Sequence, residues 1–341
     1  MLDTLKYTFM VDQMQTELER KQDARKRLDL YFGNQAPYVK ERLEQFFSDP
    51  DRFSIASFNV VRKIINAKAA LYIRDATRTI STDKDQQLFD KVQKQCALGL
   101  KMRQANKLSK LLGTIFLKVV WRNGQLAIDL LTPDVCSVTT GKSPNDLESI
   151  TIAFYPSDGK VQNLEYSKWT RDRIYRLDHN GKVKSSEENP YKSLPFIAIH
   201  DDLPVNEFWQ YPGDSLVTMQ DLINEKIVDL AYTMRLQGFS IPVIKGSQGQ
   251  IDYFDPSQAI SLPDTQHSDF RFESPDSPIA EIRQTLDYLI RELAVTEGLP
   301  ASYLQSQASE RKSGVALLVQ NRELQEIRSY DIDLFNIYEQ E

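Results

Sequence analysis

Two amphipathic helical segments flank a stretch rich in proline and glycine, and this order restricts the fold more than any other feature of the chain. The apolar positions of both segments recur at helical spacing: Leu222, Ile223, Ile227 and Leu230 in the first, and Ile282, Leu286, Leu289 and Leu293 in the second. The stretch 241–278 between them is expected to form short strands and turns. The pattern predicts an antiparallel helix pair with a small β region at its tip. Each apolar stripe can pack on the partner helix or on a neighbouring subunit, and periodicity does not choose between these.

Residues 1–112 are expected to be mostly helical, because apolar residues recur there at helical spacing. The helices are expected at four places: 3–32, 38–47, 59–73 and 84–112. A last helix is expected from about Gly314 to the final residue, after a polar loop at 299–313.

The hydrophobic period changes at Gly113, and residues 113–212 read as an antiparallel β-meander. Thr114–Trp121 and Gln125–Leu131 are rich in β-branched and aromatic residues, and Asn123-Gly124 between them is a strong hairpin signal. Further strands are expected at Val135–Thr139, Ser149–Tyr155, Asn163–Ser167, Arg173–Leu177 and Phe196–His200. The sequence therefore predicts an α+β fold: an α-rich region with a meander, a long helical hairpin, a small β tip and a long C-terminal helix.

Composition excludes several classes of protein. Of the 341 residues, 41% are hydrophobic and 26% are charged, which is ordinary for a globular chain and unlike a disordered one. No apolar run approaches the roughly 20 residues that span a bilayer, and the N-terminus lacks the pattern of a secretory signal. Two cysteines argue against a disulfide framework, and a reducing compartment such as the cytosol fits.

Charge is distributed unevenly along the chain. Residues 1–120 carry 22 Lys and Arg against 14 Asp and Glu, whereas residues 121–341 carry 20 against 34. From Lys91 to Lys118 there are seven basic residues and no acid. This stretch can be the solvated face of a helix, or it can contact a phosphate backbone or an acidic partner.

Catalytic and metal-binding motifs are largely missing, so no catalytic residue, metal or cofactor is expected. Thr139-Thr140-Gly141-Lys142-Ser143 ends like a phosphate-binding loop, but Cys136 stands where that motif needs a glycine. The adjacent acids Asp201 and Asp202 suit a divalent cation, although acids that follow a strand are more often a solvated turn.

Several short segments occur along the chain in a characteristic order: Leu30-Tyr31-Phe32-Gly33, Asn59 to Tyr72, Gly113 to Trp121 with Pro133-Asp134, Gly213 to Asn224, Ile241 to Gly246, Gly298-Leu299-Pro300 and Ser313 to Leu317. With these segments the chain resembles the portal proteins of tailed bacteriophages, in particular the type found in long-tailed phages of Gram-positive hosts. No single motif is diagnostic, whereas their order and distances together are specific.

The resemblance divides the chain into named parts. It implies a wing at 1–112 and 113–212, a first stem helix at 213–240, a clip at 241–278, a second stem helix at 279–298, a tunnel loop at 299–313 and a tunnel helix at 314–341. Portal proteins also have a C-terminal crown, and this sequence is expected to stop before one.

The resemblance implies a homo-oligomeric ring, usually of twelve subunits, at one capsid vertex of the virion and assembled in the host cytoplasm. Double-stranded DNA passes through its channel without sequence specificity. The implied partners are the terminase, a head-completion adaptor, and capsid and scaffolding proteins, with no membrane. This function involves no enzymatic activity of the chain.

Site residues follow from the implied parts. Residues of the tunnel loop are expected to face DNA: Ser302, Tyr303, Gln305, Gln307, Glu310, Arg311, Lys312 and Ser313. Residues of the clip are expected to contact neighbouring subunits and the terminase: Lys245, Gln248, Gln250, Asp252, Tyr253 and Phe254. The eight apolar stem residues named above are expected to pack subunits together.

Two other functions stay open on the sequence alone. One is a metal-dependent enzyme acting on nucleic acid, with Asp201 and Asp202 as ligands and a third carboxylate brought near by the fold. The other is a capsid scaffold or adaptor without a channel. Neither accounts for the order helix, insert, helix, loop and helix.

Overall fold

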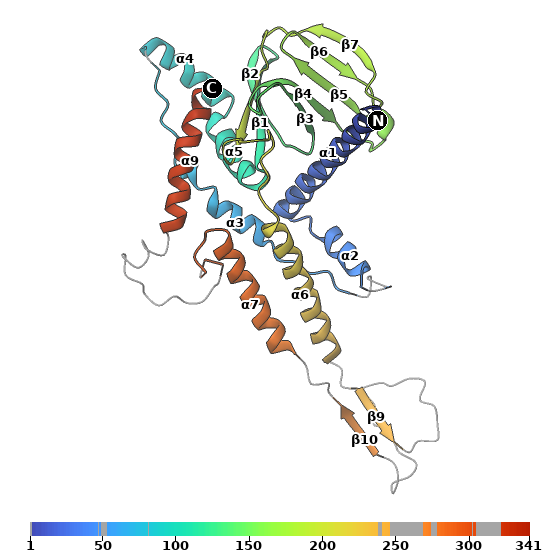
Figure 1. Ribbon diagram of the computed structural model, residues 1–341. Coiled ribbons are helices and arrows are strands. Elements are labelled where there is room, and N and C mark those ends of the chain that lie inside the picture. Colours follow the sequence, from blue (N-terminus) through green and yellow to red (C-terminus); the bar gives the residue numbers. More distant parts are fainter. Residues whose placement is uncertain are drawn as a thin grey trace. The chain divides into compact units, whose positions relative to one another are not determined.

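A computed structural model describes residues 2–46, 48, 53–80, 82–237, 241–245, 269–273, 278–301, 303–304 and 322–341 of the chain. It is a mixed α+β structure with antiparallel sheets, as the sequence predicts (Figure 1). The chain forms two compact units. The first comprises Met1–Asn34, Asn59–Val217 and Leu293–Glu341, and the second comprises Gln35–Phe58 and Thr218–Glu292.

The described α-helices lie before residue 113 and after residue 214. They are α1 (Leu2–Phe32), α2 (Ala36–Glu44), α3 (Val60–Lys68), α4 (Asp83–Gln95), α5 (Leu98–Leu112), α6 (Ser215–Gln237), α7 (Ile279–Thr296) and α9 (Arg322–Gln340), with short 3₁₀ turns at Leu71–Ile73 and Val161–Asn163. The strands are β1 (Thr114–Arg122), β2 (Gln125–Leu131), β3 (Cys136–Thr140), β4 (Leu147–Phe154), β5 (Glu165–Thr170), β6 (Arg173–Leu177), β7 (Val183–Glu188), β8 (Phe196–His200), β9 (Ile241–Lys245) and β10 (Asp269–Glu273).

Two expected helices are interrupted. The helix expected at 59–73 begins with Asn59 as its N-cap, whose side chain accepts a hydrogen bond from the Arg62 amide, but it ends at Lys68. The helix expected at 84–112 is split, because Ala97 adopts a left-handed conformation with φ of 53° between α4 and α5. A single residue in that conformation breaks the helical hydrogen-bond ladder, and no hydrophobic pattern reports it.

The hairpin of β1 and β2 forms as predicted. Its register pairs Arg122 with Gln125, so Asn123-Gly124 makes a two-residue turn in which both residues have positive φ. Gly113 joins α5 to β1, and a Cβ there would lie 2.0 Å from the Gln210 carbonyl oxygen. Only glycine therefore allows residue 210 to pass so close to the end of α5.

The prediction of one continuous meander is wrong. The strands form a three-stranded sheet in the order β2-β1-β8 and a five-stranded sheet in the order β3-β4-β5-β6-β7, both antiparallel. The chain changes sheets after β2 and returns at β8. Strand β7 was missing from the prediction, because all six of its residues are exposed and it lacks the alternation of a half-buried strand.

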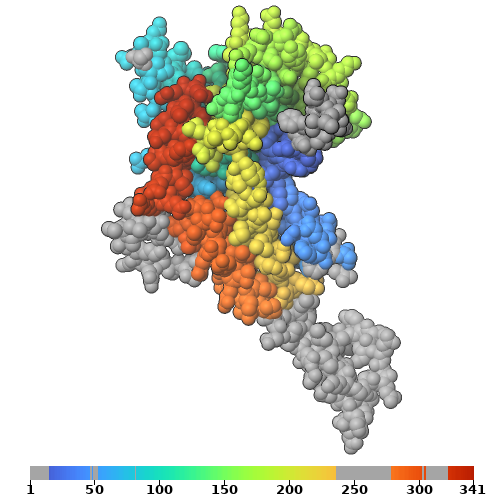
Figure 2. All heavy atoms as spheres, viewed as in Figure 1, coloured from blue at the N-terminus to red at the C-terminus, as the bar shows by residue number. Residues whose placement is uncertain are grey.

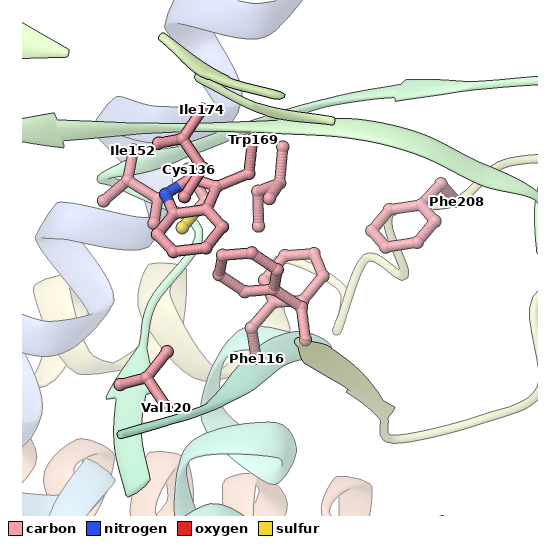
Figure 3. Packing of buried hydrophobic residues seen from close by; sticks show 9 residues of the cluster. Phe116, Val120, Cys136, Ile152, Trp169, Ile174 and Phe208 are labelled. Carbon is pink, nitrogen blue, oxygen red and sulfur yellow. The ribbon is translucent and has the colours of Figure 1, made fainter. Parts of the chain in front are cut away.

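The core of the first unit lies where the two sheets face each other (Figure 3). Its buried side chains come from both sheets and from the segment after β8: Phe116, Val120, Cys136, Ile150, Ile152, Trp169, Ile174, Phe196 and Phe208. Aromatic rings fill much of it, with Phe116 stacked on Phe208 at 5.6 Å between ring centroids and Trp169 edge-on to Phe196 at 5.5 Å.

The second unit contains most of α6 and α7, which lie beside each other (Figures 1 and 2). Helix α2 packs on α6 through a small apolar core of Val39, Leu43 and Val228, with Phe53 against it. Strands β9 and β10 form an antiparallel pair in which Lys245 lies opposite Asp269. Sequence reasoning expected short strands in this region and gave no sign that residues 35–58 belong with α6.

Candidate functional site

Most residues expected in the tunnel loop and clip lie outside the described part of the chain. These are Ser302, Gln305, Gln307, Glu310, Arg311, Lys312 and Ser313 in the loop, and Gln248, Gln250, Asp252, Tyr253 and Phe254 in the clip. Tyr303 is described and is exposed. Lys245 is the last residue of β9. The roles expected for all these residues stay predictions.

The eight apolar residues of α6 and α7 are covered to a large extent within one chain. Ile223, Ile227, Leu286, Leu289 and Leu293 are buried, and Leu222, Leu230 and Ile282 are half-buried. The stripe that the period of 3.6 residues predicts therefore faces protein. The additional packing of neighbouring subunits on these residues stays a prediction.

A cluster of buried amide side chains fixes residue 35 against α6. The Asn224 Nδ2 donates to Gln35 Oε1 at 2.8 Å, and the Gln220 Nε2 donates to Asn224 Oδ1 at 3.0 Å and to the Phe58 carbonyl at 2.7 Å. Gln35, Gln220 and Asn224 are all at most 2% exposed. Because neutral amides satisfy one another here, they fix the register of the segment without burying a charge.

Sequence reasoning missed this amide cluster, although a signal was present. Gln220 and Asn224 are one helical turn apart and lie next to the apolar stripe of α6. Polar residues on a buried helix face usually have partners.

In the first unit, Lys110 of α5 forms ion pairs with Asp201, which directly follows β8, and with Asp331 of α9. Its Nζ lies 2.6 Å from Asp201 Oδ1 and 2.7 Å from Asp331 Oδ1. Burial lowers the pKa of Lys110, but the two carboxylates outweigh this effect and raise its pKa above the usual range. Burial raises the pKa of Asp331, and Lys110 opposes that shift only in part. Lys110 is therefore a buried ammonium ion bound by carboxylates from two distant segments.

A second ion pair anchors the C-terminal end of α9. The Arg78 guanidinium donates through Nε and Nη2 to both Glu339 oxygens, at 2.6 and 2.7 Å. The Tyr72 hydroxyl donates to the same carboxylate, and its pKa is raised by burial and by that carboxylate. A bidentate contact of this kind is stronger and more directional than a single hydrogen bond.

His200 lies buried between β1 and α9. The Thr114 hydroxyl lies 3.0 Å from His200 Nδ1, and the His200 amide donates to the Tyr338 hydroxyl at 3.1 Å. Burial lowers the pKa of His200 to about 4. The imidazole is therefore neutral at pH 7 and acts as a packing element of the fold.

Asp201 and Asp202, the acids of the alternative enzymatic function, are both engaged by protein groups. Asp201 binds Lys110, and Asp202 accepts a hydrogen bond from the Tyr330 hydroxyl. Asp331 is the nearby third carboxylate that an enzyme would need, but the Lys110 ammonium lies between it and Asp201. Among the described residues no group of three or more His, Cys, Asp or Glu side chains could hold a metal ion.

The seven basic residues between Lys91 and Lys118 do not form one surface. Lys91 and Lys94 are exposed, Arg103 contacts Asp75, and Lys110 is buried. Lys118 points into the space between the two sheets. The stretch is therefore divided between solvent, ion pairs and the interior.

In the part of the chain that the structure describes, no helix combines the length and apolarity needed to cross a membrane.

Comparisons with known proteins give a structural likeness only. No protein-family model matches the chain, and no curated protein matches it. Among solved structures, a chain from the neck of an empty gene transfer agent particle, computed with C6 symmetry, has a TM-score of 0.48 and 15% identity over 80% of this chain and 73% of that one. A chain from the virion of a native gene transfer agent particle has a TM-score of 0.46 and 13% identity over 76% and 69%.

Proposed function

We propose that this chain is the portal protein of a tailed bacteriophage. In this role it forms a homo-oligomeric ring, expected to have twelve subunits, at one capsid vertex. The terminase drives DNA into the capsid through the channel of the ring, and the DNA later leaves by the same route. The chain is a conduit and a docking platform, and it carries out no chemistry itself.

The order of elements is the observation that carries the proposal. Helix α6 leads into strand β9, strand β10 pairs with β9 and leads into α7, and α9 follows later in the sequence. The portal resemblance assigns these elements to the first stem helix, the clip, the second stem helix and the tunnel helix. A helical hairpin that carries paired strands beyond its helix ends is a specific arrangement, and neither alternative function accounts for it.

Exposed apolar side chains on the two stem helices support assembly. Tyr288 on α7 is 60% exposed and Met234 on α6 is 56% exposed, although the buried faces of both helices are already covered within the chain. Such side chains on otherwise satisfied helices are candidates for contacts between copies.

The negative charge of residues 121–341 fits a conduit. Many lysine and arginine contacts to phosphates would add up to tight, salt-dependent binding and would hold the DNA in place. An acidic lining instead lets the duplex slide, and a few cations such as Arg311 and Lys312 guide it. The double variant Arg311→Glu/Lys312→Glu tests this guiding role, which is wrong if packaged DNA length and infectivity are unchanged.

The clip is proposed to bind the terminase and later the head-completion adaptor. Deletion of residues 246–268 tests this assignment, because their removal should weaken ring stability and abolish terminase binding. Stable rings that still bind the terminase would overturn the assignment.

Negative-stain electron microscopy of the purified chain tests the proposal as a whole. End-on class averages should show rings with a central stain-filled hole, and their symmetry gives the subunit number. The variant Tyr288→Asp should reduce the fraction of rings, whereas Tyr155→Asp on the exposed end of the meander should not. Compact particles without a hole, at all protein concentrations that can be reached, would contradict the portal function.

The alternative functions have their own outcomes. Cleavage of plasmid DNA that depends on a divalent metal and is lost in Asp201→Asn would support the enzyme. A closed or filled assembly without a channel would support the scaffold or adaptor.

A further inference from the structure

A cleft of about 480 Å³ opens in the first unit beside the core of the two sheets. Its walls come from the end of β1, from β5 to β7 and from the segment after β7, and among them are Lys118, Trp121, Trp169, Glu187 and Tyr191. Neither the portal function nor its alternatives assign a role to this cleft.

Lys118 is an inward-pointing cation on a strand face that is otherwise apolar. Phe116 and Val120, two residues before and after it on β1, are buried in the core. The Lys118 Nζ lies 4.3 Å from the ring centroid of Trp169 and 5.8 Å from that of Phe196. Within the described residues its ammonium group has no hydrogen bond and no ion pair, and burial lowers its pKa. The charge of Asp129 and the faces of two aromatic rings offset part of the lost hydration.

Among the described residues no carboxylate near Lys118 forms an ion pair with it, although Glu187 lies opposite Ile174 in the β6–β7 register and so shares the sheet face of Trp169. Asp129 lies opposite Lys118 in the β1–β2 register, but its carboxylate binds Arg122 at 2.5 Å. Glu187 and Glu188 on the edge strand β7 are exposed, and neither lies within ion-pair distance of Lys118. Lys118 is therefore a partly buried cation with an accessible cleft in front of it and no carboxylate bound to it.

Two aromatic side chains, Trp169 and Tyr191, line the cleft beside Lys118. The Trp121 backbone amide donates to the Tyr191 hydroxyl at 2.9 Å, which holds the tyrosine at the opening. Aromatic side chains are enriched at protein interfaces, because they give a large contact area.

We propose that this cleft binds a peptide segment of a partner protein that places a single Asp or Glu side chain against Lys118 and an apolar side chain against Trp169 and Tyr191. A carboxylate there would form the ion pair that Lys118 lacks in a partly desolvated place, where such contacts are strong. Glu187 and Glu188 at the same opening disfavour runs of acidic residues, so one carboxylate between apolar residues is the preferred sequence. The proposal concerns a single subunit and does not depend on the ring.

The test uses synthetic peptides and the full chain. Acetyl-Gly-Leu-Glu-Leu-Gly-amide should bind at least tenfold more tightly than the same peptide with Gln in place of Glu, and more tightly than acetyl-Gly-Glu-Glu-Glu-Gly-amide. Binding is followed by tryptophan fluorescence and by NMR of lysines dimethylated with ¹³C-formaldehyde. The signal that is missing in Lys118→Met belongs to Lys118, and its pKa should rise when the Glu peptide binds.

Matched variants separate recognition from folding. Lys118→Met should fold normally, because it replaces a partly buried charge with an apolar side chain of similar length, and it should lose the preference for Glu over Gln. Tyr191→Ala should weaken binding of the Glu peptide. Lys168→Met is the control, because Lys168 lies next to Trp169 on β5 and strand alternation places it on the opposite face. Equal binding of Glu and Gln peptides, or equal losses in Lys118→Met and Lys168→Met, would overturn the proposal.

Discussion

Helix α9 and the segment 35–58 each pack on parts of the chain that are far away in the sequence, and opposite kinds of contact hold them in place. In the first unit α9 is held by buried ions, with Lys110 binding Asp331 and Arg78 binding Glu339. In the second unit residues 35–58 are held on α6 by neutral groups, namely the amides of Gln35, Gln220 and Asn224 and a small apolar core. The difference shows that one chain can fix distant segments with charged groups or with neutral ones. The stability of the two regions should therefore respond differently to pH and to mutation.

The stability that the ion pairs of α9 provide depends strongly on every charged partner being present. A buried charge that loses its counter-ion is far more costly than an amide that loses one hydrogen bond, because desolvation of an ion is so unfavourable. All three tryptophans (Trp121, Trp169 and Trp209) lie in the first unit, so tryptophan fluorescence reports its unfolding selectively. Hydrogen exchange of the α6 amides reports on the second unit.

The largest effect is expected from Lys110→Met. It leaves Asp201 and the buried Asp331 facing each other without a cation, and it should cost about 3–5 kcal/mol of the free energy of unfolding. Urea unfolding followed by tryptophan fluorescence measures this loss. The double variant Lys110→Met/Asp331→Leu should recover most of it, because no unpaired charge stays buried in α9. A loss below about 1 kcal/mol in the single variant would mean that the ionic contact is not what holds α9.

A smaller effect is expected from acidification, through His200. Its pKa is about 4 in the folded chain and about 6.5 when unfolded, so the folded state binds fewer protons. The contribution is fully present above pH 6.5 and is lost as the pH falls through 4, by up to about 3 kcal/mol. Carboxyl groups titrate in the same window, so the measured quantity is the difference in unfolding free energy between the wild type and His200→Asn. A difference that does not change from pH 7 to pH 4 would contradict the neutral, buried imidazole.

A moderate effect without pH dependence is expected from Asn224→Ala in the second unit. The substitution removes the hydrogen bonds to Gln35 and Gln220 and leaves buried amide atoms without partners, at a cost of about 1–3 kcal/mol. The protection factors of the α6 amides against hydrogen exchange should fall by the same factor at pH 5 and pH 7. The unfolding transition followed by tryptophan fluorescence should stay the same. Met234→Ala on the exposed side of α6 is the control. A strong dependence on pH would remove the contrast between the two regions.

The smallest effect is expected where the second unit does use charge. Arg42 on α2 binds Glu225 on α6 at 3.2 Å, but its side chain is 47% exposed. Exposed ion pairs contribute little and are screened by salt, so Arg42→Gln should cost less than about 1 kcal/mol, and less still in 0.5 M salt. Hydrogen exchange of α6 measures this loss. A cost equal to that of Lys110→Met would show that burial is not what separates the two regions.

The local parts of this fold could be predicted from the sequence because their signals are local. The Asn123-Gly124 turn, the strands β6 and β8 and the two apolar stripes of α6 and α7 follow from turn chemistry and period. The left-handed Ala97 and the division of the meander into two sheets could not be predicted, because neither depends on a hydrophobic pattern. They are set by which segments meet in space.

The charged and amide contacts left weaker traces in the sequence. Asp331 lies in phase with the buried Leu324, Phe335 and Tyr338 of α9, and an acid on an apolar face indicates a cationic partner elsewhere. The sequence cannot say that this partner is Lys110, some 220 residues earlier, because a charge pair carries no periodicity. Lys118 is similar, since its aromatic neighbours come from β5 and β8.

The contacts of α9 also set an order of events during synthesis. Arg78 and Lys110 leave the ribosome long before residues 331 and 339 are translated, yet their carboxylate partners on α9 lie there. Until those codons are read, both cations must stay hydrated, and the helices and strands around them stay open to water and to chaperones. The first unit therefore completes its fold only after translation has passed Glu339, and a ribosome that stalls earlier exposes an unfinished core.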